Sequence, residues 1–199
     1  MKKTVILISG TPSVGKTTIA QKLKDRLNAF YINLTSFAKG NNLISGFDEK
    51  RQTAIIAEEK MRKKIKEIVN SVNKDILIID GHYAASVVPK EYVTKIFVLR
   101  RNPIELKNFM EKKEFRNNKL WENLESEILD VCLIESLCKL EESKICELDI
   151  TGLTVDEVVN WIIAILFDKK KCEFGKIDWL KMLETKGLLD QYLKKITVI

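Results

Sequence analysis

A glycine-rich stretch near the start of the chain constrains the fold more than any other feature. Residues 10–18 read GTPSVGKTT, which fully matches the pattern GxxxxGK[ST]. The stretch follows an apolar run at residues 4–9 and precedes a helical segment at residues 16–27. In such a loop the glycines permit a tight turn whose amides surround phosphate, Lys16 neutralises the phosphates and Thr17 offers its hydroxyl to magnesium. The sequence therefore predicts a site for a nucleoside triphosphate with Mg2+, and in this context a chance match is the weaker alternative.

Apolar runs bounded by turn residues mark the expected strands. Three of them, rich in Ile, Leu and Val, occupy residues 4–9, 75–80 and 95–100, and two weaker candidates occupy residues 29–33 and 145–150. Such runs suit strands that are buried on both faces of a parallel sheet. The segments between them predict helices over residues 16–27, 51–72, 103–112, 119–140 and 154–167. Strands that alternate with helices indicate a doubly wound α/β fold, whose ligands bind beyond the carboxyl ends of the strands.

The predicted helix over residues 119–140 carries an apolar stripe. Residues at three- and four-residue spacing, which we expect to face the core together, are Leu120, Leu124, Ile128, Val131, Ile134 and Cys138. The four cysteines lack CxxC spacing, and with one histidine in the chain a zinc site has few ligands. We expect Cys132 and Cys138 to lie as small apolar residues on a helix face.

The end of the sequence differs from the rest in pattern and charge. The net charge is +6, and residues 167–199 hold eight lysines against five acidic residues, about half of the excess. A basic balance favours polyanions such as nucleotides, RNA or ribosomal particles, although charge alone is better explained by a solvated lysine-rich surface. We expect one domain over residues 1–166 and a basic helical extension over residues 167–199, packed on that domain or docking a partner. No apolar run is long enough to cross a bilayer, so we expect a soluble, cytoplasmic protein without a membrane partner.

A second candidate site lies where the run at residues 75–80 ends. Taken alone, a terminal Asp80 is more often a cap, but beside a phosphate loop it suits a magnesium ligand that acts through water. Gly81 would let the backbone turn so that His82, the single histidine, approaches the phosphates. Whether a neutral imidazole orients water or an imidazolium counters phosphate charge stays open at this point.

Two segments are placed to close over the bound nucleotides. Residues 31–46 follow the second strand and could cover an acceptor, and residues 112–119 are dense in cations and could cover the donor phosphates. A GTPase would read guanine with Asn-Lys-x-Asp, but residues 118–121 read NKLW and lack the acid. The arrangement is that of a small nucleoside monophosphate kinase.

Several motifs together resemble the adenylate kinase isoenzyme 6 family, whose archaeal members are usually labelled putative adenylate kinases. They are GTPSVGKTT at residues 10–18, YIN at 31–33, DGH at 80–82, FVLR at 97–100 and NLESEI at 123–128. The resemblance covers about residues 1–166. It implies a P-loop fold of adenylate-kinase type with a five-stranded parallel sheet and helices on both faces. It also implies a monophosphate-binding segment around residues 33–56 and a short lid around residues 112–122.

The resemblance implies an activity and partners as well. It implies ATP bound at Ser13, Gly15, Lys16, Thr17 and Thr18, with Mg2+, and transfer of its γ-phosphate to AMP, giving two ADP, or to water. Members are associated with maturation of the small ribosomal subunit, with a small-subunit ribosomal protein and pre-ribosomal RNA as partners. The family's Asp-x-His signature maps onto Asp80 and His82, and the histidine is implicated in ATP hydrolysis.

Some positions depart from the family pattern. The lid's usual Arg-Gly is Lys113-Glu114 here, and because lysine lacks the bidentate fork of arginine, kinase chemistry depends on Arg116 taking over. In the monophosphate segment Lys39, near Asn33, stands where the family has arginine, and Ser13 replaces a loop glycine as a milder change.

Other polar residues near the strand ends have two interpretations each. Thr151 and Gly152 lie where related folds cradle adenine, although a plain turn explains them almost as well. We expect one of Arg100 and Arg101 to face phosphate and the other to face solvent. For Lys113 and Arg116, solvated surface charge is the structural alternative.

Three functions remain open from the sequence. The first is a kinase that uses AMP, with some ATPase activity. The second is mainly a nucleotide-switched ribosome assembly ATPase with weak or no kinase activity. The third is a kinase for another small acceptor, which would differ only in residues 33–56.

Overall fold

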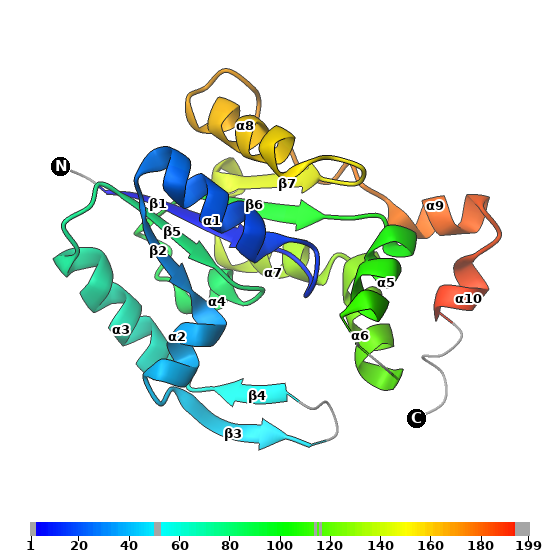
Figure 1. Ribbon diagram of the computed structural model, residues 1–199, viewed down its shortest axis with the longest axis horizontal. Helices are drawn as coiled ribbons and strands as arrows, with labels where there is room; N and C mark the ends of the chain where they lie inside the picture. The colour runs from blue at the N-terminus through cyan, green and yellow to red at the C-terminus, as the bar shows by residue number, and fades with distance from the viewer. Residues whose placement is uncertain (1–2, 50–52, 114, 116, 194–199) are drawn as a thin grey trace.

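A five-stranded parallel sheet forms the centre of the computed structural model, which describes residues 3–49, 53–113, 115 and 117–193 (Figure 1). The sheet order is β2-β5-β1-β6-β7, and every neighbouring pair is parallel. Its strands are β1 (Thr4–Ser9), β2 (Phe30–Asn33), β5 (Ile76–Asp80), β6 (Val93–Arg100) and β7 (Ile145–Asp149). The predicted doubly wound α/β fold and its five strands are confirmed.

Helices cover both faces of this sheet, and each face has its own apolar core. On one face α1 (Lys16–Leu27) and α8 (Val155–Leu166) bury Leu23, Val159 and Ile162 against the sheet. On the other face lie α2 (Leu34–Gly40), α3 (Glu58–Ser71), α4 (Ala84–Val87) and α7 (Val131–Lys139). The arrowheads of β1, β6 and β7 point toward α5 (Pro103–Lys112) and α6 (Asn117–Ile128) in Figure 1. The carboxyl ends of the strands therefore open toward these two helices.

The predicted helix over residues 51–72 was wrong in its first part. Thr53–Ile56 forms strand β4, which pairs antiparallel with β3 (Ile44–Asp48), and α3 begins only at Glu58. Residues 50–52 lie outside the described residues. β-Branched residues in β4 favour a strand, and the hairpin leaves Phe47 and Ile55 about half exposed. The hairpin stands away from the main sheet, in the region where the sequence placed a monophosphate-binding segment.

The predicted helix over residues 119–140 is two helices. α6 ends at Ile128, and Asp130 has a φ of +57°, a left-handed conformation that no α-helix continues through. Leu124 and Ile128 are buried as predicted, but Val131 is 45% and Ile134 52% exposed, so the second half of the stripe was wrong.

The break rotates the face that α7 presents to the core. After the break α7 buries Cys132, Leu133 and Ser136. The expected placement of Cys132 on a buried helix face agrees with this, whereas Cys138 is exposed.

The residues after α8 pack on the same core as α1 and α8. In α9 (Trp179–Thr185) and α10 (Leu189–Leu193) the buried side chains are Trp179, Leu183 and Tyr192. A short 3-10 helix, η1 (Glu142–Lys144), precedes β7. The division of the chain at residue 166 stays a prediction, and residues 194–199 lie outside the described residues. Among the described residues, no helix combines the length and apolar character needed to cross a membrane.

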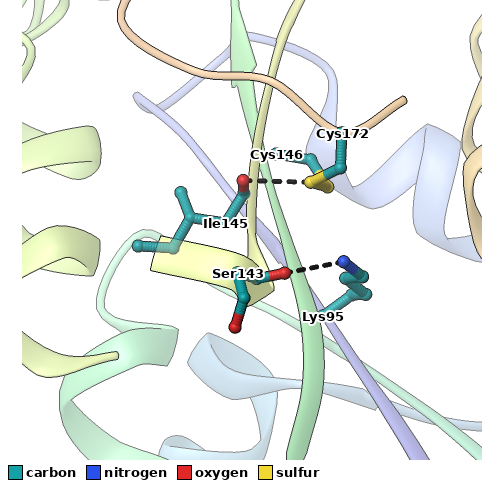
Figure 2. The surroundings of a disulfide bond; sticks show 5 residues. All are labelled: Lys95, Ser143, Ile145, Cys146 and Cys172. Atoms are coloured by element: carbon teal, nitrogen blue, oxygen red, sulfur yellow. Dashed lines mark hydrogen bonds between the residues drawn. A yellow bond between two sulfur atoms is a disulfide. The ribbon is translucent and has the colours of Figure 1, made fainter. Parts of the chain in front are cut away.

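A disulfide joins Cys146 of β7 to Cys172, 26 residues later in the chain (Figure 2). The Cα atoms are 5.0 Å apart, and the Glu147 amide next to Cys146 donates to the Glu173 carbonyl over 2.8 Å. Figure 2 also shows Lys95 of β6 donating to the Ser143 carbonyl beside this bond. The segment after α8 is thus fastened to the edge of the sheet. The bond was not predicted from the sequence, because a separation of 26 residues gives no local spacing signal.

Candidate nucleotide site

The register of the sheet brings the predicted acid to the phosphate loop. Asp80 is paired with Ile8 of β1 on one side and with Asn33 of β2 on the other. Residues 10–15 follow β1 directly, so the loop begins in the same row as Asp80 and Asn33. Parallel strands end at one edge, and this edge collects the polar residues that three separate sequence segments supply.

The phosphate loop contains three residues with a positive φ. Gly10 has a φ of +132°, and a Cβ there would lie 2.4 Å from the Leu99 carbonyl oxygen, so only glycine fits. Gly15 has a φ of +119° and is the N-cap residue of α1. Ser13 has a φ of +69°, a conformation that costs about 1–2 kcal/mol for a residue with a Cβ. Ser13 therefore carries backbone strain that a glycine at this position would not, and its mildness for nucleotide binding stays a prediction.

Lys16 lies inside the loop and is aimed at its carbonyl groups. Its Nζ donates to the carbonyl oxygens of Gly10 and Thr11 over 2.7 and 2.9 Å. Burial lowers the pKa of Lys16 to about 8, although Asp80 and Glu127 raise it. Thr17 and Thr18 follow in the first turn of α1 and are exposed, which leaves both hydroxyls open to a ligand at the helix N-terminus.

Asp80 is fully buried, and among the described residues only one of its two carboxylate oxygens has a hydrogen-bond partner. Its Oδ1 accepts from Asn33 Nδ2 over 2.6 Å, and the same Nδ2 lies 3.5 Å from Thr17 Oγ1. Asn33 is held in this orientation because its Oδ1 caps α2 by accepting from the Ser36 amide. Asp80 Oδ2 has no hydrogen-bond partner within the part of the chain that the structure describes. A buried carboxylate oxygen beside a threonine hydroxyl fits a magnesium ion with several waters.

His82 follows Asp80 at the mouth of the site, where the residue is exposed. Its carbonyl accepts from Ser9 Oγ over 3.2 Å, and its ring packs edge-on against Tyr83 with centroids 4.8 Å apart. Crowding of the ring by protein atoms, together with the charges of Lys16 and Lys119, lowers the pKa of His82 to about 4. At neutral pH the imidazole is therefore uncharged, which favours the first of the two protonation states left open by the sequence.

Glycine is needed at position 81 for a different reason than the backbone turn expected from the sequence. Gly81 is not among the residues with a positive φ, so the turn itself does not require glycine. Instead, a Cβ there would lie 2.7 Å from Leu34 Cδ1 at the start of α2. Gly81 is needed because helix α2 packs directly against the backbone that carries His82.

The monophosphate-binding segment expected at residues 33–56 contacts the segment expected as a lid at residues 112–122. Lys119 of α6 donates to Thr53 Oγ1 of β4, which joins the β3–β4 hairpin to the first turn of α6. Lys113 is exposed at the end of α5 and is close enough to Lys16 to lower its pKa. Lys39 is exposed on α2. Arg116 lies outside the described residues, so its predicted role is not placed.

The loop after β7 borders the phosphate loop but uses its polar groups internally. Thr151 Oγ1 donates to Asp149 Oδ1 and accepts from the Asn102 amide, over 2.5 and 2.8 Å. The Gly152 amide donates to Glu105 Oε2 over 3.2 Å. These bonds agree with the turn interpretation of Thr151 and Gly152, and an adenine contact stays a prediction.

Both arginines at the end of β6 are buried, so the expectation that one faces solvent was wrong. Arg101 lies against the back of the phosphate loop, with Nε donating to the Val14 carbonyl over 3.2 Å and an ion pair to Glu105. Arg100 is 1% exposed and pairs with Glu127. Sequence reasoning missed Glu127, whose Oε2 accepts from Thr11 Oγ1 over 2.6 Å. Its only signal was its place in the NLESEI motif.

A basic groove elsewhere is separate from these residues. It has a volume of about 530 Å³ between α3, α4 and α7, and its cations are Arg62, Lys63, Lys66, Lys90 and Lys139. None of the predicted site residues lines it. The nucleotide site is thus defined by strand ends and the phosphate loop.

One known protein family matches about the first two thirds of the chain. The family described as AAA domain matches residues 6–130. This range includes the phosphate loop, Asp80, His82 and Glu127.

Relatives match over nearly their whole length. A protein of Methanococcus maripaludis named "Putative adenylate kinase" is 37% identical over 182 residues, which cover 89% of this chain and 96% of that protein. A protein of the same name from Methanocaldococcus jannaschii is 39% identical over 174 residues, covering 87% and 92%. The matches thus extend well beyond the phosphate loop.

Two solved kinases share the fold at low sequence identity. Shikimate kinase from Acinetobacter baumannii, in complex with shikimate, has a TM-score of 0.61 at 12% identity, covering 84% of this chain and 95% of that one. Thymidylate kinase from Candida albicans has a TM-score of 0.52 at 14% identity, covering 89% and 96%. At this identity the likeness concerns the fold alone.

Proposed function

The chain belongs to the AAA-domain family and to the family of archaeal proteins named putative adenylate kinase, and we propose that it transfers the γ-phosphate of ATP to AMP. The single observation that carries this proposal is the row formed by Lys16, Thr17, Asn33 and Asp80 at one edge of the sheet. It joins a triphosphate loop to a candidate metal ligand and to the start of the segment expected to hold the acceptor.

The donor side of this row suits ATP. Lys16 and the amides of residues 13–18 would surround the β- and γ-phosphates, as in other loops of this pattern. Thr17 and Asp80, the latter through water, would hold the magnesium ion, which supplies neutralisation of phosphate charge when bound. The Oδ2 atom of Asp80, to which no residue in the described ranges donates a hydrogen bond, supports this assignment.

The acceptor side is supported by the hairpin and by α2. Asn33 and Lys39 lie at the two ends of α2, and the β3–β4 hairpin reaches Lys119 of α6 across the site. In the proposed reaction an oxygen of the AMP phosphate forms a bond to the γ-phosphorus while the bond from that phosphorus to the β-phosphate oxygen breaks. Two molecules of ADP leave. Because the protein contributes mainly position and charge, Lys16 and Lys113 would act by holding the transferring group.

The test is a coupled assay of ADP formation from ATP with AMP, with other monophosphates and without an acceptor. We expect AMP to raise ADP formation well above the rate with ATP alone. Asp80→Asn should lower every magnesium-dependent rate by about 100-fold, because it removes a charged ligand from a buried site. Asp75→Asn is the matched control, since Asp75 is exposed at the other end of the same run. ADP formation that does not depend on AMP would contradict the proposal.

A second candidate function is ATP hydrolysis coupled to assembly of the small ribosomal subunit. The neutral imidazole of His82 beside Lys16 favours it, because an uncharged ring nitrogen can accept a hydrogen bond from water and orient it. The partners implied by the family resemblance are a small-subunit ribosomal protein and pre-ribosomal RNA. In this case His82→Ala would lower hydrolysis more than it lowers ATP affinity. Pull-downs with and without ATP that recover no ribosomal component would count against the assembly role.

A further inference from the structure

A buried carboxylate on α6 connects the phosphate loop with the segment that follows α8. Glu127 is 1% exposed, and three other elements reach it. Its Oε2 accepts from Thr11 Oγ1 of the phosphate loop over 2.6 Å. Its Oε1 accepts from the Trp179 indole Nε1 over 3.1 Å, from Arg100 Nε over 2.8 Å and from the Arg101 amide over 3.1 Å. Both oxygens of a buried charge are thus satisfied by donors far apart in the sequence.

Glu127 is connected to Lys16 of the phosphate loop through Thr11. Thr11 is 1% exposed, so its side chain has no access to solvent as an alternative partner. The carbonyl oxygen of the same Thr11 accepts from Lys16 Nζ and from the Val14 amide, over 2.9 and 3.2 Å. A shift of Thr11 would therefore move the acceptors that orient Lys16 and the turn that presents the loop amides.

The Trp179 indole, which donates to Oε1 of Glu127, is also held in place. Trp179 is 7% exposed and begins α9, whose Leu183 is fully buried in the core of α1 and α8. The chain leading to it is fastened to β7, because the Gly175 amide donates to Glu147 Oε2 over 2.8 Å. The Trp179 indole therefore has a fixed position from which it meets Glu127.

Glu127 also lies in a cluster where negative charge exceeds positive charge. Arg100 pairs with Glu127, Glu147 and Asp130, so one guanidinium serves three carboxylates. Buried carboxylates in such a cluster depend on neutral donors for the rest of their stabilisation. For Glu127 those donors are the Thr11 hydroxyl, the Arg101 amide and the Trp179 indole.

We propose that Glu127 is a positioning residue for the phosphate loop, and that the segment after α8 takes part in ATP binding by completing the environment of Glu127 through Trp179. The inference rests on the proposed binding of ATP at this loop. Neither residue touches the nucleotide. They act by holding Thr11, and through Thr11 the carbonyl that orients Lys16, in the arrangement that the triphosphate meets.

The test compares ATP affinity, KM values and thermal unfolding in two variants. Glu127→Gln keeps the size of the side chain but replaces one acceptor oxygen by an NH2 group. This group cannot accept the hydrogen bonds that surround the carboxylate. Trp179→Phe keeps an aromatic ring but removes the indole N–H group together with part of the ring system, a loss of size that Trp161→Phe reproduces elsewhere in the chain. We expect the Kd and KM for ATP to rise about tenfold in the first variant and about threefold in the second, with the KM for AMP unchanged. Because both changes act through one carboxylate, the double variant should lose less than the product of the two effects.

Two matched controls separate positioning from general loss of structure. Glu135→Gln alters another carboxylate that accepts a hydrogen bond from a hydroxyl group. Its donor is Ser86 Oγ of α4, at 2.5 Å, and not a residue of the phosphate loop. Trp161→Phe alters a half-buried tryptophan of α8 that has Lys170 over its ring. Neither control should change the Kd for ATP.

The result that overturns the proposal is a folded Trp179→Phe or Glu127→Gln protein that melts at a lower temperature but binds ATP as the wild type does. If Glu127→Gln fails to fold, Trp179→Phe alone decides. A wild type that binds ATP but shows no AMP-dependent transfer would contradict the proposed acceptor and leave this inference standing on the Kd comparison. A wild type that does not bind ATP would overturn both.

Discussion

At the scale of single residues, the protonation state of His82 limits what this side chain can do. An uncharged imidazole can accept a hydrogen bond or orient water, whereas it cannot neutralise phosphate. Its pKa of about 4 means that the group loses its proton well below neutral pH. The reactions open to His82 at pH 7 are therefore those of a base or of a hydrogen-bonding partner.

This leads to a prediction for the only histidine in the chain. We expect its imidazole NMR signals to keep the pattern of the neutral ring from pH 8 down to about pH 5, because desolvation of the ring by the surrounding protein atoms and then the charges of Lys16 and Lys119 lower its pKa. A titration of the ring signals between pH 3 and 8 measures this, and with one histidine no assignment is needed. Replacing Lys119 by Met should raise the midpoint. A midpoint near 6.5 in the wild type would contradict the lowered pKa.

The sequence predicted the residues of the site that belong to local patterns. Lys16 and Thr17 follow from the loop motif, and Asp80 follows from its place at the end of an apolar run. Glu127 could not be predicted, because its contact with Thr11 spans 116 residues and depends on where α6 meets the sheet. The strain at Ser13 was equally hidden, since a motif gives residue types but no backbone angles.

At the scale of elements, the sequence predicted the five strands because buried runs of Ile, Leu and Val are local signals. The β3–β4 hairpin was missed because its charged and glycine-containing stretch lacks such a run. The break between α6 and α7 was missed because residues at three- and four-residue spacing continue across Asp130. A periodic stripe indicates helix, but it does not reveal one residue in a left-handed conformation.

The break can be tested with two neighbouring residues of α7. Leu133 is 4% exposed and Ile134 52% exposed, the reverse of what an unbroken stripe requires. We expect Leu133→Ala to lower the free energy of unfolding by about 2–4 kcal/mol, because it leaves a cavity in the core. Ile134→Ala should change it by less than about 0.5–1 kcal/mol. Urea unfolding of the two variants measures the difference, and a larger loss for Ile134→Ala would restore the single continuous helix.

At the scale of the whole molecule, the disulfide closes a loop of the chain that contains α8. Cys146 and Cys172 are 26 residues apart, and a loop of this length corresponds to about 3.5 kcal/mol of chain entropy lost by the unfolded state. The bond therefore acts on the unfolded chain at least as much as on the native contacts around β7.

Reduction should make this contribution visible. We expect a reducing agent to lower the free energy of unfolding by about 2–4 kcal/mol in urea, while a Cys146→Ser/Cys172→Ser protein does not respond. Thiol counting in denaturant is the direct check, with two reactive thiols, Cys132 and Cys138, before reduction and four after it. Four reactive thiols in protein that has not been reduced would exclude the bond.

The contact between Trp179 and Glu127 has a consequence for the order in which the protein is made. The phosphate loop leaves the ribosome early, and α6 follows more than a hundred residues later. Trp179 is translated another 52 residues after Glu127. At about 5–20 residues per second, roughly 10 to 30 seconds separate the synthesis of the loop from that of the indole that completes its support. We therefore expect the phosphate loop of a nascent chain to lack the support of Trp179 at first. Such a chain should gain full affinity for nucleotide only once α9 has left the ribosome and packed on the core.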